Sequence, residues 1–447
     1  MLNDALQIYP EIDFAPDCPV DGTPLHIEST AIPGMRSLVE GVCPSCDSPY
    51  YVDLPVSHAL WNRVTLNPKT QELYNSREPN WITRALLKGF LNQDQREIIP
   101  VVHKFRDAER IVILNCLDYV YGHALLKLLN AQRHIDNSPE VGCCVLVSPE
   151  LSDLVPDGVA EIWEFPVLVG EYWKWYPSLQ RWVNAQLRER KECFLSFAYS
   201  HPSNNVFDLR RYVRNLPDVS AELKGHSPVI MFCHREDRLW GRTLAEQQQH
   251  LQKLLDQLSD VFPELAFILL GFGRETKLHA QRAKLIDVRV DRFEKQMARK
   301  WLAYMQNTDC CIGVMGSNML LPSGLAKSTV DLVQRTRSLN FFQDVLFTNC
   351  NEDVRLAFLK YRFVFGNARL SDVKVAQVID AVASIFAHSE RSTFWFRIGE
   401  EDSVEFRKAA PNVQAQALAY LRAERAKEHN LGNYRADEFL DPANGLL

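Results

Sequence analysis

The amino-acid sequence predicts an α/β fold with two domains built on parallel sheets, preceded by a small cysteine-containing module. Three observations predict it. Apolar runs of strand length alternate with amphipathic helical segments over residues 105–220 and again over residues 221–387, as in repeated strand-helix-strand units. The polar stretch NLPDVSAELKGHSP separates the two series. A segment rich in Pro and Gly, with three cysteines, precedes both.

The composition excludes several classes of protein. The chain has 447 residues, 46% hydrophobic and 24% charged, which suits two to four globular domains and excludes disordered and collagen-like classes. Lys and Arg number 50 against 56 Asp and Glu, a net charge of -6 without long charge blocks, so no nucleic-acid partner is expected. Neither a signal peptide nor an apolar run of membrane-spanning length occurs, and we expect a cytoplasmic protein without a membrane span.

The first 55 residues predict a zinc-ribbon-like module. Their cysteines lie in two short segments, CPVDG and CPSCDSPYY, typical of the tight turns in which thiolates share one ion. The first turn lacks a second cysteine, and an aspartate there can supply an oxygen; His26 is the alternative fourth ligand. The expected ligands are Cys18, Asp21, Cys43 and Cys46. We expect one structural zinc, the alternative being a ribbon that has lost its metal, and the module could bind a protein partner or brace the fold.

Residues 56–104 look helical and amphipathic, and predict a connector. The N-terminal α/β domain then spans residues 105–220. Its expected strands are residues 110–117, 142–151, 160–168 and 192–199, with helical segments between them. The remaining cysteines lie mostly in such apolar runs, so they are expected to be buried free thiols and not a disulfide framework.

The second α/β domain spans residues 221–387. Its helix at 243–262 has Thr243 as an N-cap candidate and apolar residues at helical spacing. A second helix is expected at 293–308 and a third from 318 onward. The expected strands are residues 228–235, 265–273, 286–290, 309–317, 330–333 and 344–347. Residues 388–447 predict a helical segment that caps the fold or returns onto the first α/β domain.

A glycine-containing loop follows the expected strand 309–317. Gly316, Ser317 and Asn318 stand where a parallel strand ends and a helix begins. At such a point backbone N–H groups converge on an anion, which favours a phosphate site. The alternative is an ordinary tight turn between strand and helix.

The segment IGVMGSNMLLPSGLA, residues 312–326, resembles the donor loop in the nucleotide-sugar-binding domain of GT-B glycosyltransferases. The resemblance covers about residues 225–350 and is strongest over 309–326. It implies two Rossmann-like domains in GT-B architecture and an enzyme that moves a sugar from a nucleotide-diphosphate donor to a glycan, protein or small-molecule acceptor. A nucleotide-sugar epimerase of the same fold and a catalytically silent scaffold, whose ribbon recruits a partner, are the alternatives.

The resemblance also implies a set of donor-binding residues. The segment CHREDRLWGR resembles the basic motif of fucosyltransferase-type enzymes, although Glu236 and Asp237 interrupt it, and the alternative is a surface ion-pair cluster. GFGRET fails as a dinucleotide fingerprint because Thr276 replaces the third glycine. No D-x-D triplet occurs, so no catalytic divalent metal is expected. The donor-binding candidates are His234, Arg235, Arg238, Arg274, Gly316, Ser317 and Asn318, with Arg242 also available.

Transfer with inversion needs a general base for the acceptor hydroxyl, and the resemblance places that base in the N-terminal domain. Asp118, after the strand at 110–117, and His123, at the start of the next helix, are the two catalytic candidates. A structural hydrogen-bonding role is the alternative for each. Four tryptophans could stack on an acceptor sugar or fill the core: Trp163, Trp173, Trp175 and Trp182.

Overall fold

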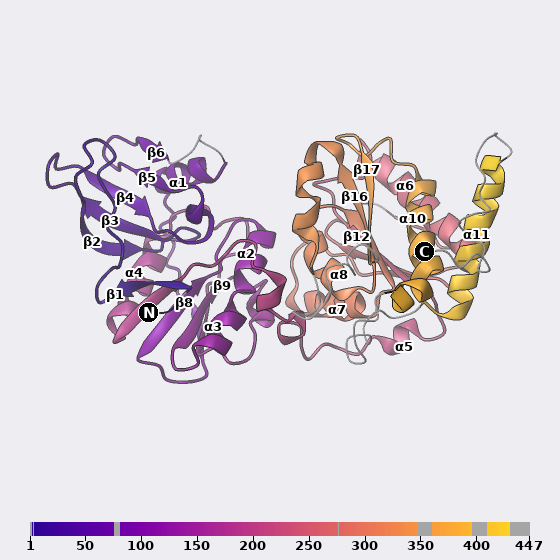
Figure 1. Cartoon of the computed structure of the whole chain (residues 1–447), viewed down its shortest axis with the longest axis horizontal. Coiled ribbons are helices and arrows are strands. Elements are labelled where there is room, and N and C mark those ends of the chain that lie inside the picture. Colours follow the sequence, from indigo (N-terminus) through magenta and orange to yellow (C-terminus); the bar gives the residue numbers. More distant parts are fainter. Residues whose placement is uncertain are drawn as a thin grey trace. The chain divides into compact units, whose positions relative to one another are not determined.

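The chain divides into unit 1, Met1–Arg214, and unit 2, Asn215–Leu447. Each unit is described by itself (Figure 1). The division falls shortly before the boundary expected at residue 220. The computed structural model describes residues 2, 4–75, 81–275, 277–346, 360–395 and 409–429. Both units contain a parallel sheet with helices, so the α/β class predicted from the sequence is confirmed.

Unit 1 is built on a six-stranded sheet in the order β1-β11-β8-β9-β10-β7. The four central strands are parallel, while β1 and β7 are antiparallel edge strands. The strands are β1 (Ala5–Tyr9), β7 (Val101–Lys104), β8 (Arg110–Asn115), β9 (Gly142–Val147), β10 (Glu161–Glu164) and β11 (Glu192–Ser196). The helices are α2 (Tyr121–Leu128), α3 (Ala131–Asn137) and α4 (Pro177–Arg188), with short 3-10 turns at Ser152–Leu154, Asn204–Val206 and Leu209–Arg211. The expected strands in this domain all lie where β8 to β11 form.

The N-terminal module forms a second, antiparallel sheet in unit 1. Its strands are β2 (His26–Ala31), β3 (Leu38–Val42), β4 (Pro49–Asp53), β5 (Val64–Leu66) and β6 (Leu73–Asn75), paired in chain order. This sheet shares one hydrophobic core with the parallel sheet, since Cys43 and Tyr50 belong to the same buried cluster as Ile111 and Ile113. The module therefore packs as part of unit 1.

The interpretation of residues 56–104 as a helical connector is corrected. The described part of this stretch holds a 3-10 turn, η1 (Ser57–Leu60), the strands β5 and β6, one helix, α1 (Trp81–Leu91), and β7. Val64 and Leu66 are fully buried and pack with Leu86 of α1. Strands of three residues are too short to show alternation, so their apolar residues resembled the face of a helix.

Unit 2 is built on a six-stranded, all-parallel sheet in the order β14-β13-β12-β15-β16-β17. Taken in chain order this is 3-2-1-4-5-6, the order of a doubly wound Rossmann sheet. The strands are β12 (Val229–His234), β13 (Ala266–Gly271), β14 (Lys284–Asp287), β15 (Cys310–Val314), β16 (Thr329–Gln334) and β17 (Tyr361–Gly366). The central strands β12, β13 and β15 are buried along their whole length, which explains their continuous apolar sequences.

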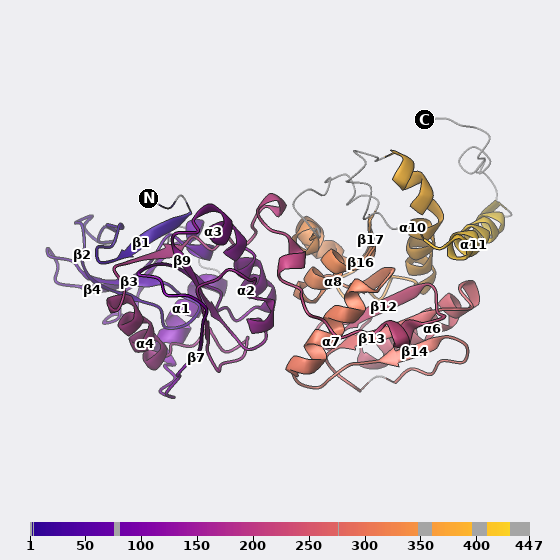
Figure 2. The ribbon, with the colours of Figure 1, turned by 90° about the horizontal axis from the view of Figure 1, so that it is seen from below.

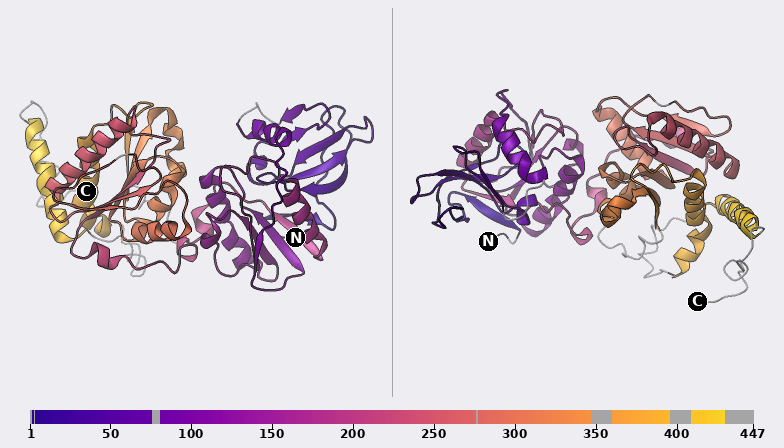
Figure 3. Two further views of the ribbon diagram at one scale, coloured as in Figure 1. Left: turned by 180° about the vertical axis from the view of Figure 1, so that it is seen from behind. Right: turned by 90° about the horizontal axis from the view of Figure 1, so that it is seen from above.

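Helices cover both faces of this sheet, as Figures 1 and 2 show and Figure 3 repeats from behind and above. The elements are α5 (Ser220–Leu223), α6 (Leu244–Val261), α7 (Lys295–Gln306), η5 (Ser317–Met319), α8 (Leu320–Leu325), η6 (Arg335–Asp344), α10 (Val375–Trp395) and α11 (Pro411–His429). Helix α6 begins as predicted at Thr243, whose side chain accepts a hydrogen bond from the Glu246 N–H. Within the described residues, no helix combines the length and apolar character that a membrane crossing needs.

One prediction for the end of the chain is corrected. No strand forms at residues 344–346, because Asp344 belongs to η6 and the next two residues are irregular; Phe347 lies outside the described residues. The sixth strand is β17, whose aromatic run YRFVFG pairs with β16. The described part of residues 388–447 packs on unit 2 itself, since Val413 and Ala417 of α11 belong to its core.

Candidate functional site

The strand order of unit 2 reverses between β12 and β15. Strands β13 and β14 extend the sheet to one side of β12, and β15, β16 and β17 extend it to the other. Open α/β sheets bind ligands at the carboxyl ends of the strands beside such a reversal. The loop that follows β12, with Arg235 and Arg238, and the loop that follows β15, with residues 316–318, both start there.

The side chains of the two loops meet at Gly316. Arg235 Nη1 donates a hydrogen bond to Asn318 Oδ1 at 2.8 Å, and Arg238 Nη1 donates to the Met315 carbonyl. A Cβ atom on Gly316 would lie 2.6 Å from Arg235 Nη1 and 2.7 Å from Arg238 Nη1. Gly316 has φ +155° and ψ -179°, a conformation that residues with a side chain rarely adopt. Position 316 therefore needs glycine for both space and backbone shape.

The charges at this point favour an anion. Arg235 also pairs with Asp237 through Nε at 2.7 Å, and this hydrogen bond lowers the pKa of the Asp237 carboxyl. The Asp237 side chain is 72% exposed, whereas that of Arg235 is 15% exposed. A ligand anion can therefore replace the Asp237 carboxylate beside Arg235, because that carboxylate is already largely in solvent. Asn318 Nδ2 is buried and has no hydrogen-bond partner among the described residues. Two guanidinium groups and an unused amide donor can together hold a phosphate.

Three other donor candidates lie apart from this cluster. His234 is 2% exposed, and its ring nitrogens lie 3.0 Å from the Phe272 carbonyl and 3.2 Å from Gln247 Nε2. Burial lowers the pKa of His234 to about 4, so the ring is neutral and anchors the end of β12. Arg274 is exposed and donates to the Arg289 carbonyl at 2.7 Å, near β14. Arg242 is also exposed, and its N–H bonds Glu246 at the start of α6.

Ser317 lies next to Gly316 and is half-buried. The helix expected to begin here is short: η5 covers three residues and α8 only six. A helix of this length contributes little dipole, so the arginines supply most of the positive charge at the loop.

Unit 1 has its own reversal of strand order, at β8. Strands β9 and β10 lie to one side of β8, and β11 lies to the other. Asp118, in the loop after β8, is fully buried, and its Oδ2 lies 2.8 Å from Lys127 Nζ, which is 1% exposed. Burial alone would raise the pKa of Asp118, but Lys127 and the neighbouring imidazoles outweigh burial and hold the pKa well below its usual range. Asp118 is therefore ionised at neutral pH.

Two histidines complete the cluster around Asp118. His123 Nδ1 lies 3.7 Å from Asp118 Oδ1, and His58 Nε2 lies 3.5 Å from Asp118 Oδ2. The two imidazole rings lie 4.7 Å apart. Burial lowers the pKa of His58 to about 4, whereas the His123 side chain is 21% exposed. The Asp118 carboxylate beside Nδ1 favours the tautomer of His123 that carries its proton on Nδ1. Nε2 is then the ring nitrogen that can accept a proton.

His58, Asp118 and His123 also have the spacing of metal ligands. The ammonium group of Lys127 already balances the Asp118 carboxylate in this buried place, so a divalent cation would add uncompensated charge. The arrangement fits acid-base chemistry better than metal binding. Asp118 and His123 are the two candidates expected from the sequence, whereas His58 comes from η1, between β4 and β5, and carries no local signal.

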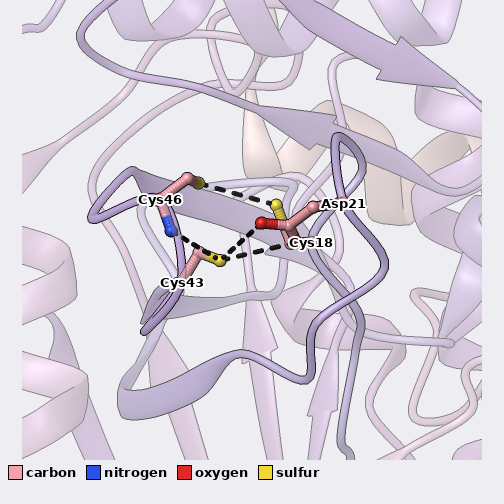
Figure 4. A group of neighbouring side chains, drawn as sticks. All are labelled: Cys18, Asp21, Cys43 and Cys46. Atoms are coloured by element: carbon pink, nitrogen blue, oxygen red, sulfur yellow. Dashed lines mark hydrogen bonds between the residues drawn. The ribbon is translucent and has the colours of Figure 1, made fainter.

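The four predicted metal ligands lie together (Figure 4). Their ligand atoms are all within 4.8 Å of one another. Cys18 Sγ lies 3.8 Å from Cys46 Sγ, and Cys43 Sγ lies 3.7 and 3.6 Å from the two carboxylate oxygens of Asp21. The Thr23 N–H donates to Asp21 and lowers the pKa of its carboxyl to about 2. A metal ion can therefore be held by three sulfur atoms and one oxygen.

The alternative ligand His26 is not part of this cluster. It lies at the start of β2, and the group with metal-ligand spacing contains Asp21 instead. Backbone hydrogen bonds shape the two turns: the Gly22 N–H donates to the Cys18 carbonyl at 2.9 Å, and the Asp47 N–H donates to the Cys43 carbonyl at 2.9 Å. The turns expected of a ribbon are thus present around the ligands.

The four tryptophans considered for an acceptor site serve mainly in packing. Trp163 and Trp175 are 0% and 4% exposed, so the stacking role is wrong for both. Trp182 packs edge-on against Trp163 with ring centroids 4.9 Å apart, and Lys88 Nζ lies 3.9 Å from the ring centroid of Trp173. Core packing, the alternative considered from the sequence, accounts for them.

The two Rossmann-like units form an α/β fold similar to that of GT-B glycosyltransferases. Among solved structures, E. coli ADP-heptose LPS heptosyltransferase II is 11% identical, with a TM-score of 0.43 and coverage of 63% of this chain and 99% of that chain. A glycosyl transferase of family 9 from Veillonella parvula is 11% identical, with a TM-score of 0.42 and coverage of 63% and 99%.

The NodZ α-1,6-fucosyltransferase soaked with GDP-fucose is 10% identical, with a TM-score of 0.30 and coverage of 50% of this chain and 94% of that chain. No family model and no curated protein sequence matches the chain. At such identities and TM-scores, function has to be argued from the residues of this chain.

Proposed function

We propose that the chain is a glycosyltransferase that takes a sugar from a nucleotide-diphosphate donor. The convergence of Arg235 and Arg238 on Gly316, at the strand reversal of unit 2, is the observation that carries this proposal. A diphosphate needs two or more positive groups, and this loop pair supplies two guanidinium groups side by side. Donor binding thus belongs to unit 2.

Departure of the diphosphate requires a positive environment in the transition state, because negative charge grows on its oxygens as the glycosidic bond breaks. Arg235 and Arg238 supply that charge in the proposal, with the unused Asn318 amide as a further donor. The chain has no D-x-D triplet to hold a bridging cation. We therefore propose transfer that is independent of a divalent metal.

The acceptor half belongs to unit 1 in this proposal. His123 acts as the general base: Nε2 takes the proton of the acceptor hydroxyl, while Asp118 faces Nδ1 and stabilises the imidazolium that forms. Asp118, buried and paired with Lys127, positions the imidazole and does not itself contact the acceptor. Attack by the activated hydroxyl on the anomeric carbon, opposite the departing diphosphate, inverts its configuration.

We also propose that Cys18, Asp21, Cys43 and Cys46 hold one structural zinc. Zinc binds sulfur at about 2.3 Å and carboxylate oxygen at about 2.0 to 2.2 Å. At tetrahedral corners these lengths place two sulfurs about 3.8 Å apart, and a sulfur and an oxygen about 3.5 to 3.7 Å apart. The distances in the cluster, 3.8 Å for the sulfur pair and 3.6 and 3.7 Å for sulfur to oxygen, fit that geometry. Four protein ligands close the site, which favours a structural role over a catalytic one.

A thermal-shift panel of GDP, UDP, ADP, CMP and dTDP sugars tests the donor proposal. One class should raise the unfolding temperature, since a ligand at 100 times its dissociation constant stabilises the folded state by about 2.7 kcal/mol. Arg238→Ala should lose this shift. Arg282→Ala removes an exposed arginine that pairs with Asp260, and should keep it. If no nucleotide sugar shifts the wild type, or if Arg235→Ala and Arg238→Ala both respond fully, the donor site is not here.

A further inference from the structure

Trp61 stands out on the surface of unit 1. It follows η1, and 43% of its surface is exposed. Among the tryptophans whose burial the structure describes, the others are buried or half-buried. The neighbouring Leu60 is also exposed, at 40%. An apolar surface of this kind, next to polar groups, commonly marks a binding site.

The backbone around Trp61 is fixed. The Trp61 and Asn62 N–H groups donate to the His58 carbonyl at 3.3 and 3.0 Å. Asn62 is fully buried, and its Nδ2 donates to Thr83 Oγ1 of α1 at 3.3 Å. On the other side of the turn, the Ser57 N–H donates to the Phe197 carbonyl, just after β11, at 2.6 Å. The backbone that carries the exposed indole is therefore held in place before any ligand arrives.

Trp61 is also close to the proposed base. Its ring lies 6.3 Å from the His58 ring, edge to face at 88°, and the His58 ring lies 4.7 Å from that of His123. His58 therefore lies between the exposed indole and the imidazole of His123, in contact with both rings. Because η1 lies between β4 and β5, the antiparallel sheet of unit 1 reaches the acid-base cluster directly.

We propose that Trp61 is the stacking platform for the acceptor and that the acceptor is a pyranoside. This inference rests on the proposed function and names the substrate class of its acceptor half. One face of a pyranose ring carries aliphatic C–H groups whose partial positive charge suits the negative face of an indole. The hydroxyl groups at the rim remain free to reach His123. An exposed indole on a fixed backbone, one ring away from the proposed base, suits a sugar ring better than a flexible peptide side chain.

Saturation-transfer NMR with the methyl α- and β-pyranosides of glucose, galactose and mannose tests this inference. At least one probe should receive saturation on the C–H protons of one ring face in the wild type. Trp61→Ala should weaken its binding about tenfold, and Trp61→Phe should weaken it less, because an aromatic face remains. Phe105→Ala is the matched control: Phe105 is a similarly exposed aromatic, at 64%, after β7, and its loss should change nothing.

Calorimetric titration of a nucleotide sugar separates this inference from the proposed function. Trp61→Ala should bind the donor as the wild type does, because unit 2 holds the donor-binding cluster. Two results with intact donor binding would overturn the acceptor inference and leave the proposed function standing. In one, pyranosides bind Trp61→Ala as tightly as they bind the wild type; in the other, no pyranoside binds either protein. If the wild type binds no nucleotide sugar, the proposed function is overturned, and the acceptor inference that rests on it is overturned as well.

Discussion

The Asp118–Lys127 pair is the residue-scale feature on which the acid-base cluster depends. Both side chains are almost fully buried, 2.8 Å apart, and the lysine keeps the carboxylate ionised. A buried pair of this kind adds little net stability, but removal of one partner leaves an uncompensated charge in the core. The pair therefore serves to hold a negative charge against His123, and the fold depends on keeping both members.

Lys127→Met should lower the free energy of unfolding by about 3 to 5 kcal/mol, because the Asp118 carboxylate then stays buried without a cation. Urea denaturation measures this loss. Lys104→Met is the control, since Lys104 pairs with Asp107 at the surface with side chains 49% and 93% exposed. An equal, small effect for both variants would show that the Asp118 charge is not maintained by Lys127.

A second residue-scale prediction concerns pH. Burial lowers the pKa of His134 to about 4, and its Nε2 lies 2.7 Å from Ser196 Oγ. The unfolded chain binds a proton near pH 6.5 that the folded chain refuses until about pH 4, so stability is lost as pH falls between these values. His134→Gln should remove up to about 1.4 kcal/mol per pH unit from that slope. An unchanged slope of unfolding free energy against pH, with urea as denaturant, would mean His134 is not kept neutral by the fold.

At the scale of elements, two tight turns determine the N-terminal module. The turn at residues 18–22 and the turn between β3 and β4 place the four ligand atoms within 4.8 Å. β4 then leads to η1, which carries His58 and is followed by Trp61. A change in the metal cluster is thus connected through one strand to the acid-base cluster.

The purified protein should contain about one zinc per chain, and Cys43→Ala should lose it, because the remaining ligands cannot close a tetrahedral site. Elemental analysis measures the content, and thermal unfolding should show a lower midpoint. Cys193→Ala removes a buried thiol of β11 that is not among the four ligands, and should keep the metal. Wild-type protein without zinc, together with an unchanged midpoint for Cys43→Ala, would remove the metal site from this account.

The sequence predicted elements best where strands are fully buried. β12, β13 and β15 are continuous apolar runs bounded by polar residues and glycine, so they were recognisable without their neighbours. β5 and β6 were not recognised, since three residues cannot show a period, and β17 was missed while a strand was expected at 344–347. The loops that follow the strands could be predicted as candidate binding sites, because the carboxyl ends of parallel strands lie at the same edge of the sheet. His58 and Lys127 could not, because their contacts with Asp118 depend on tertiary packing.

At the scale of the whole molecule, each unit places its polar cluster at the point where its strand order reverses. The cluster of unit 1 holds a buried carboxylate and a partly exposed imidazole, while that of unit 2 holds two guanidinium groups around a glycine. The proposed division of work follows from these charges: a base needs a neutral imidazole, and a departing diphosphate needs cations.

If donor binding belongs to unit 2 and acceptor activation to unit 1, substitutions in the two units should impair different steps. His123→Ala should abolish sugar transfer while donor affinity stays unchanged, because the imidazole belongs to the acceptor half. Ser317→Ala should instead weaken donor or transition-state binding by about 1 to 3 kcal/mol, through loss of a hydrogen bond to a charged oxygen. Calorimetry gives the donor affinity, and release of free nucleotide gives the turnover. A loss of donor affinity in His123→Ala would contradict the assignment of the two halves.

The most direct test of the central claim is calorimetric titration of the selected nucleotide sugar into protein exposed briefly to EDTA, too briefly to strip the proposed structural zinc. The wild type should bind with the same affinity as in the absence of EDTA, since arginines neutralise the diphosphate. Gly316→Val should give no binding heat, because its side chain would displace both Arg235 and Arg238. Strict dependence on added Mg²⁺ or Mn²⁺, with Gly316→Val binding like the wild type, would place the donor elsewhere and contradict the account.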